Sequence, residues 1–224
     1  MPGSTTTAAL ERAVHRYRSA PVAARAHVHG RAFLADLAVV DRYVPTHGFI
    51  VDLGCGHGLF ANLLAEAAPG RRVLGIDIDE RKIAVARSTV QGRESLRFEV
   101  GNIIREPAPR CDAVTVVDVL YLLSPVDQEA VLRNAASALA ENAPLIVKAQ
   151  ERTASARYLF GYAQEVIATA IGLTRGATTG LHYLSRREAI AMFERAGFLV
   201  DVIEMPRRLY TDVVYIARKA PASR

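Results

Sequence analysis

A glycine-rich stretch between two apolar segments, DLGCGHG at residues 52–58, constrains the fold more than any other part of the sequence. Residues 49–53 form an apolar run typical of a strand buried on both faces, and residues 59–67 have apolar side chains at helical spacing. The glycines therefore lie at a sharp reversal from strand to helix. Because glycine has no Cβ, such a turn takes positive φ and lets a ligand approach the backbone, with the first free N–H groups of the helix facing it. The sequence predicts a strand-turn-helix unit that binds a ligand at its turn.

A second predicted strand, residues 72–77, ends in a carboxylate about 20 positions after the glycines. An acid at that distance can accept hydrogen bonds from both hydroxyls of a ribose, so Asp77 is the strongest single candidate for ligand binding. Capping a helix is the other role open to it. Asp79 suits that role better, because it directly precedes the helix predicted over residues 80–87.

The spacing of the glycines favours one class of cofactor. A dinucleotide fingerprint G-x-G-x-x-G beginning at Gly54 would need a small residue where Leu59 stands. The spacing D-x-G-x-G-x-G, together with Asp77, instead resembles the first two motifs of the class I methyltransferases, which use S-adenosyl-L-methionine (SAM). In that family the glycine loop wraps the amino-acid part of SAM.

The order of predicted elements fits the same family over about residues 45–219. It predicts an α/β fold, a doubly wound and mostly parallel seven-stranded sheet with helices on both faces and a C-terminal antiparallel hairpin. The predicted strands after the first two cover residues 95–100, 111–117, 144–150, 198–204 and 212–217. Ser124 with Pro125 begins a helix to about residue 139, and a capping box at Ser185 begins a helix that Gly197 closes.

We expect one domain at residues 45–219, preceded by a helical extension at residues 1–44. In the extension, residues 1 to about 8 are small and polar and are predicted to be disordered. Two helices are predicted over residues 8–19 and 32–43, with breaks at Pro21 and Gly30. The resemblance implies that this segment closes over SAM or the acceptor, which makes Tyr17 and Arg18 candidate contacts. Packing against the sheet edge is the alternative.

The resemblance implies a SAM site at the carboxyl ends of the first four strands. Its predicted residues are Asp52, Gly54, Cys55, Gly56, Gly58, Asp77, Ile78, Asn102, Ile103 and Asp118. Asn102 departs from the Gly-Asp pair that the family carries to bind the adenine amino group. An amide oxygen can also accept from that group, and a turn asparagine is the other interpretation.

The acceptor side is predicted around Asp118 and Tyr121, since ligands of doubly wound sheets lie beyond the carboxyl ends of the strands. Lys148, in an otherwise apolar strand, is interpreted as a snorkelling side chain rather than a catalytic one. The link at about residues 151–184 is too long for a simple connection, and apolar residues at helical spacing within it predict a lid helix with Tyr162 as a substrate contact. Core packing and a membrane-surface helix are the alternatives.

Methyl transfer depends mainly on positioning, so a general base is optional. If the acceptor is an oxygen or nitrogen, His182 or Tyr183, just before the capping box, is the candidate proton acceptor. His57 is interpreted as structural, because a protonated imidazole beside a sulfonium would be repelled.

Composition excludes several other classes. The net charge of +5 comes from scattered arginines rather than a dense basic run, so we expect no nucleic-acid partner. Two cysteines support neither a disulfide framework nor a metal site, and no apolar stretch reaches the length of a membrane span, so we expect a cytoplasmic protein. The fourth strand is not followed by the Asn/Asp-Pro-Pro-aromatic motif used on nucleobase and glutamine amines.

The predicted function is therefore transfer of a methyl group to a small, fairly apolar acceptor, with the oligomeric state left open. A SAM-binding protein without catalysis and a nucleotide-cofactor oxidoreductase are the alternatives.

Overall fold

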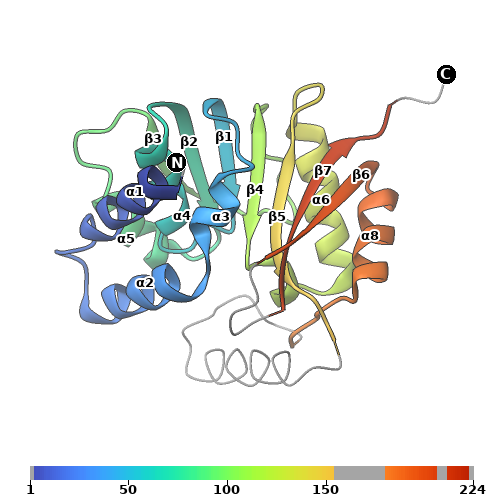
Figure 1. The fold of residues 1–224 in the computed structure, drawn as a ribbon, viewed down its shortest axis with the longest axis horizontal. Coiled ribbons are helices and arrows are strands. Elements are labelled where there is room, and N and C mark those ends of the chain that lie inside the picture. The colour runs from blue at the N-terminus through green and yellow to red at the C-terminus, as the bar shows by residue number, and fades with distance from the viewer. Residues whose placement is uncertain (1–2, 154–179, 206–210, 222–224) are drawn as a thin grey trace.

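The computed structural model describes residues 3–153, 180–205 and 211–221. The described strands are β1 (His47–Leu53), β2 (Gly70–Asp77), β3 (Leu96–Val100), β4 (Ala113–Val117), β5 (Leu145–Gln150), β6 (Phe198–Glu204) and β7 (Asp212–Lys219). They form one seven-stranded sheet in the order β3-β2-β1-β4-β5-β7-β6 (Figure 1). Strands β1 to β5 pair in parallel, and β7 is antiparallel to both β5 and β6. The predicted fold class is confirmed.

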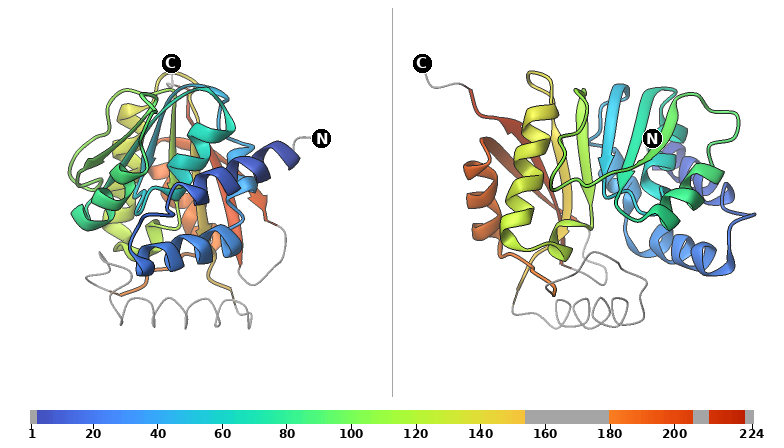
Figure 2. Two further views of the ribbon diagram at one scale, coloured as in Figure 1. Left: turned by 90° about the vertical axis from the view of Figure 1, so that its left-hand side faces the viewer. Right: turned by 180° about the vertical axis from the view of Figure 1, so that it is seen from behind.

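Helices cover both faces of this sheet. They are α1 (Gly3–His15), α2 (Val22–Leu34), α3 (Leu37–Asp41), α4 (Leu59–Ala67), α5 (Glu80–Ser88), α6 (Pro125–Ala138) and α8 (Arg186–Arg195), with a 3-10 turn η1 (Leu120–Leu122) after β4. Side chains of α1 to α5 form one apolar core with one face of the sheet, and side chains of α6 and α8 form a second core with the other face. The two groups of helices stand on opposite sides of the sheet in Figure 2.

The helix starts follow the capping chemistry of the sequence. Asp79 accepts from the amides of Arg81 and Lys82 at the start of α5, and Ser124 accepts from the Asp127 amide at the start of α6. The capping box before α8 is complete, with Ser185 and Glu188 bonding each other's backbone amides. These three predicted helix starts are confirmed.

The N-terminal helices differ from the prediction. Helix α1 already begins at Gly3, so the disordered start predicted for residues 1–8 is wrong for the described part, and α2 runs through Gly30. A glycine inside a helix costs only about 1 kcal/mol. Val28 and Ala24 of α2 are buried, and their burial offsets that cost. The break falls instead at Asp36, which takes a left-handed φ of 46° before α3.

The order of the strands reverses between β1 and β4, at the centre of the sheet. In such sheets a crevice opens beyond the carboxyl ends of the strands at this point. Helix α2 lies at that edge (Figure 1). Among the described residues, no helix has the length and apolar character needed to cross a membrane. The predicted lid helix and Tyr162 lie outside the described residues.

Candidate cofactor and acceptor site

The three glycines of the turn after β1 have left-handed backbones but different surroundings. Their φ angles are 73° at Gly54, 54° at Gly56 and 80° at Gly58. A Cβ at Gly54 would stand 2.5 Å from Val119, and one at Gly58 would stand 2.5 Å from Phe98. A Cβ at Gly56 would meet no atom within 4 Å. Gly54 and Gly58 thus allow close packing of the protein, whereas Gly56 borders open space.

Asp77, at the end of β2, is joined to this turn. Its Oδ2 accepts from the amide of Gly56 at 2.8 Å, and its Oδ1 accepts from the amide of Asp79 at 2.9 Å. A carboxylate offers about four acceptor positions, so both oxygens retain capacity for the hydroxyls of a ribose. The structure therefore fixes the orientation of this carboxylate beside the open side of Gly56.

Most amides of the turn are engaged by the protein itself. The amides of Gly54 and Cys55 donate to the carbonyl of Ile76, at 2.7 and 3.1 Å, and the amide of Gly58 donates to the carbonyl of Cys55 at 2.8 Å. The amide of Gly56 donates to Asp77. An ionic ligand group at this turn would therefore depend on charged side chains.

Asp52, within β1, is such a side chain. It is 2% exposed, and its Oδ1 accepts from the hydroxyl of Thr115 at 2.7 Å. Its Oδ2 has no hydrogen-bond partner among the described residues. Burial raises the pKa of Asp52 to about 7, although the hydrogen bond from Thr115 and the charge of Arg31 act in the opposite direction. A cationic ligand group would be a suitable partner for the second oxygen.

A network of buried charges lies at the ends of β4 and β5 and the start of β7. The ammonium of Lys148 lies 2.7 Å from Asp118 Oδ1 and 2.8 Å from Asp212 Oδ2, and Arg31 Nη1 lies 3.1 Å from Asp118 Oδ2. Burial alone would raise the pKa of Asp118, but the charges of Lys148 and Arg31 outweigh it and lower that pKa. Asp118 also has an unusual left-handed φ of 57°.

The snorkelling interpretation of Lys148 is wrong. Its side chain is only 2% exposed, and its charge is held between two carboxylates rather than in solvent. Burial would lower the pKa of Lys148, yet Asp118 and Asp212 raise it above its ordinary value. The sequence does not reveal the partners of Lys148, because β7, which carries Asp212, pairs with β5 although the two strands are far apart in the chain.

The remaining residues predicted for the cofactor lie around the same edge. Asn102 Oδ1 accepts from the amide of Ile104 at 3.0 Å, as a turn asparagine does, and Ile78 is 57% exposed. Ile103 is half-buried. Cys55 is also half-buried, and its Sγ would stand 2.8 Å from a Cβ at Gly75, consistent with a small residue filling the loop.

Tyr17 and Arg18, the two candidate ligand contacts in the N-terminal segment, contact other residues of the protein. Tyr17 is 1% exposed, and its hydroxyl donates to the backbone carbonyl of His57 at 2.7 Å, so it supports the glycine turn from within. Arg18 is exposed and lies beside His15.

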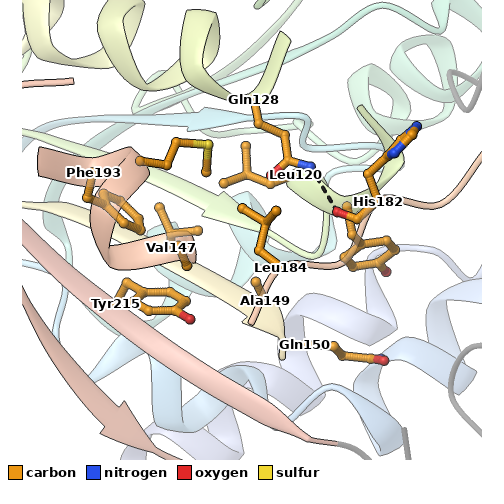
Figure 3. A pocket seen from close by; sticks show the side chains of 12 residues that line it. Leu120, Gln128, Val147, Ala149, Gln150, His182, Leu184, Phe193 and Tyr215 are labelled. Atoms are coloured by element: carbon orange, nitrogen blue, oxygen red, sulfur yellow. Dashed lines mark hydrogen bonds between the residues drawn. The ribbon is translucent and has the colours of Figure 1, made fainter. Parts of the chain in front are cut away.

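On the acceptor side, Tyr121 and Tyr183 are both buried and stack with ring centroids 4.7 Å apart. They adjoin an apolar pocket whose lining includes Leu120, Val147, Leu184 and Phe193 (Figure 3). Its free volume of about 20 Å³ has room for one or two water molecules.

His182 lies at this pocket, and its backbone is fixed. Its amide donates to the carbonyl of Tyr121 at 2.7 Å, and its carbonyl accepts from Gln128 Nε2 at 2.9 Å. Its imidazole extends away from the apolar side chains of the pocket (Figure 3). The backbone of His182 thus joins η1 to α6, while its ring is directed outward.

Comparison with known proteins agrees with this geometry. Residues 50–142 match a family model described as a methyltransferase domain. The family match and the strand order together support a class I methyltransferase domain in this chain. The cofactor of such domains is SAM, as the first two motifs predict, and the unpaired oxygen of Asp52 and the open side of Gly56 fit it.

Individual relatives are similar over different shares of their length. A trans-aconitate 2-methyltransferase of Acidovorax sp. (strain JS42) is 35% identical over 81 residues, which are 36% of this chain and 31% of that protein. The matches to the curated relatives cover less than a third of their length.

Two solved structures show the same fold over most of this chain. The pyocyanin biosynthetic protein PhzM has a TM-score of 0.71 at 18% identity, over 92% of this chain and 61% of PhzM. Magnesium protoporphyrin IX methyltransferase from Synechocystis PCC 6803, solved with SAH bound, has a TM-score of 0.61 at 21% identity, over 87% of this chain and 84% of that protein.

Sequence reasoning missed Arg31 and Asp212. The predicted break at Gly30 leaves Arg31 outside the helix that contains it, and the predicted strand at residues 212–217 gives Asp212 no further role. Asp212 Oδ1 is buried without a hydrogen-bond partner among the described residues. One signal was present, namely a lysine within an apolar strand, which requires a buried anion nearby.

Proposed function

We propose that the chain transfers the methyl group of SAM to a small, fairly apolar acceptor. SAM supplies a methyl group on a sulfonium, which needs in-line approach of the acceptor rather than a strong base. Asp77 binds the ribose hydroxyls, Gly56 leaves room for the amino-acid part, and Asp52 pairs with its ammonium group. The observation that carries this proposal is the hydrogen bond of Asp77 to the amide of Gly56, which holds the acid beside the open side of the turn.

The apolar character proposed for the acceptor is supported by the side chains beyond β4 and β5. Leu120, Tyr121 and Leu184 line the small pocket there, and Tyr183 stacks on Tyr121. The charges of Lys148 and Arg31 balance those of Asp118 and Asp212 nearby, which favours a neutral acceptor over a highly charged one. His182 and Tyr183 are kept as proposed proton acceptors, and Tyr121 and Tyr162 as proposed acceptor contacts.

We also propose residues 45–219 as the methyltransferase domain, residues 1–44 as its helical extension and about residues 151–184 as a lid. Helix α1 is attached to α4 by Arg12 and Arg16, whose guanidinium groups lie 3.1 and 3.0 Å from Glu66. This contact supports a role for the extension in holding the helix that follows the glycine turn.

A SAM-binding protein without catalysis is the second candidate. It is favoured by two observations, namely that both oxygens of Asp118 are occupied and that the His182 ring points away from the pocket. The two candidates share the cofactor site and differ only in whether a methyl group leaves it.

One measurement tests the cofactor, and a second separates the two candidates. Titration calorimetry with S-adenosylhomocysteine (SAH) and with NADH should show binding of SAH alone, and preference for NADH would contradict the proposal. Incubation with methyl-labelled SAM and fractionated small metabolites should yield a labelled product together with SAH. Binding of SAM without product in any fraction would favour the non-catalytic candidate.

A further inference from the structure

Helix α2 lies against the glycine turn. The rings of His27, on α2, and His57, in the turn, have centroids 4.9 Å apart. Arg31 follows His27 by four positions, so the two side chains share one side of the helix. The guanidinium of Arg31 reaches Asp118, 3.1 Å away, at the end of β4. Arg31 therefore spans the space between the turn after β1 and the turn after β4.

The charge of Arg31 acts on titratable groups from both turns. Burial is the largest influence on the pKa of five surrounding groups, and in each of them the charge of Arg31 also acts toward a lower pKa. These groups are His27, Asp52, His57, Asp118 and Asp212. The guanidinium is therefore within electrostatic range of all five groups, and it contacts Asp118 directly.

The amino-acid part of SAM carries two opposite charges, and the site needs a partner for each. The unpaired oxygen of Asp52 suits the ammonium group. The amides of Gly54, Cys55, Gly56 and Gly58 are engaged by the protein, so they offer little to a carboxylate. A cationic side chain is suited to supply that partner.

Of the two cations in the charge network, Arg31 is better placed than Lys148 to bind a ligand carboxylate. Lys148 is enclosed by Asp118 and Asp212 and is 2% exposed, whereas the Arg31 side chain is 31% exposed. A guanidinium carries five N–H donors, so it can hold two carboxylates at once, often with paired hydrogen bonds.

We propose that Arg31 binds the carboxylate of the amino-acid part of the cofactor, with Asp118 as the positioning residue that holds its guanidinium in place. This inference rests on the proposed function. A positioning role also explains the left-handed φ of Asp118, since strained backbone is retained where it places a functional side chain.

The test compares two ligands that differ at this group. SAH contains the carboxylate, and 5′-methylthioadenosine has the same adenosine and thioether without the amino-acid end. Titration calorimetry of the full chain should show Arg31→Met binding SAH about 10- to 100-fold more weakly, the scale for a lost charge-assisted pair, with 5′-methylthioadenosine changed less than about twofold. Arg31→Lys should recover part of the SAH affinity, because it retains the charge without the paired geometry.

Lys82 provides a matched control. Its charge also lowers the pKa of His57, after the larger influence of burial, but it stands on α5 beyond Asp77 and Asp79. Lys82→Met should leave the ratio of the two affinities unchanged. Asp118→Asn should weaken SAH alone, by less than Arg31→Met does.

The outcomes are distinct. Equal losses for both ligands in Arg31→Met would show that Arg31 only supports the fold, and an unchanged SAH affinity would show that it does not reach the carboxylate; either overturns the inference. If Arg31→Met does not fold, Arg31→Lys decides, through a loss confined to SAH. A wild-type chain that binds neither ligand overturns the proposed function, and this inference with it.

Discussion

The two halves of the sheet hold their functional residues by different means. In the cofactor half, β1 to β3, Asp77 bonds to Gly56 and Asp79, which are 21 and 2 positions away in the chain. In the acceptor half, β4 to β7, Lys148 joins Asp118, 30 positions away, to Asp212 on a strand that returns antiparallel. The first arrangement follows from local chain chemistry, and the second exists only once the whole sheet has formed.

The halves also differ in what they do with buried charge. The cofactor half leaves an oxygen of Asp52 unpaired beside the turn, whereas the acceptor half encloses Lys148 between carboxylates. A buried group without a partner beside the turn is suited to a ligand, and a closed charge network is suited to the fold. Substitutions should therefore mainly reduce binding in the first half and mainly reduce stability in the second.

The largest effect is expected from Lys148→Met. Removing this ammonium leaves Asp118 and Asp212 buried without their shared partner, which should lower the free energy of unfolding by about 3–5 kcal/mol. Urea unfolding measures it. The control is Arg133→Met, which removes an exposed ion pair with Glu129 on α6 and should cost less than about 1 kcal/mol. Equal effects of the two substitutions would show that the acceptor half does not depend on its buried charges.

The next prediction concerns Asp52 and pH. Its pKa is about 7 in the folded protein against 3.8 without the fold, so the folded state retains a proton between these values that the unfolded state loses. The stability from this proton is full below about pH 4 and is lost as pH rises through 7. As pH rises from 4 to 8 in the absence of cofactor, the free energy of unfolding of Asp52→Asn should rise by roughly 2–4 kcal/mol relative to that of wild type. Urea unfolding measures these free energies, and the same pH dependence in wild type and Asp52→Asn would contradict the prediction.

A third prediction separates two glycines of the same turn. Gly56→Val should weaken SAH binding at least about 100-fold while the protein stays folded, because its side chain strains the left-handed backbone but otherwise enters only the open space that a ligand would use. Gly58→Val should instead lower the melting temperature, since its side chain would collide with Phe98. Calorimetry and thermal unfolding of both variants check this. Normal SAH binding by a folded Gly56→Val protein would remove the turn from the site.

The difference between the halves also explains what the sequence could predict. The glycine turn, the carboxylate at the end of β2 and the helix caps follow from residues close together in the chain, and the structure has each of them. The role of Lys148 depends on the pairing of β5 with β7, which no local pattern encodes. The continuity of α2 through Gly30 depends on tertiary burial of Val28, which outweighs the local preference.

The central claim is that Asp77 and the glycine turn form a SAM site, and Asp77→Asn tests it most directly. Asparagine retains an acceptor for the amide of Gly56 but loses the one for the amide of Asp79, so the turn should keep its form with a small fall in melting temperature. Loss of the charge-assisted hydrogen bonds to the ribose should weaken SAH and 5′-methylthioadenosine alike by about 1.5–3 kcal/mol in titration calorimetry. Unchanged affinity of the folded variant for both ligands would contradict the claim.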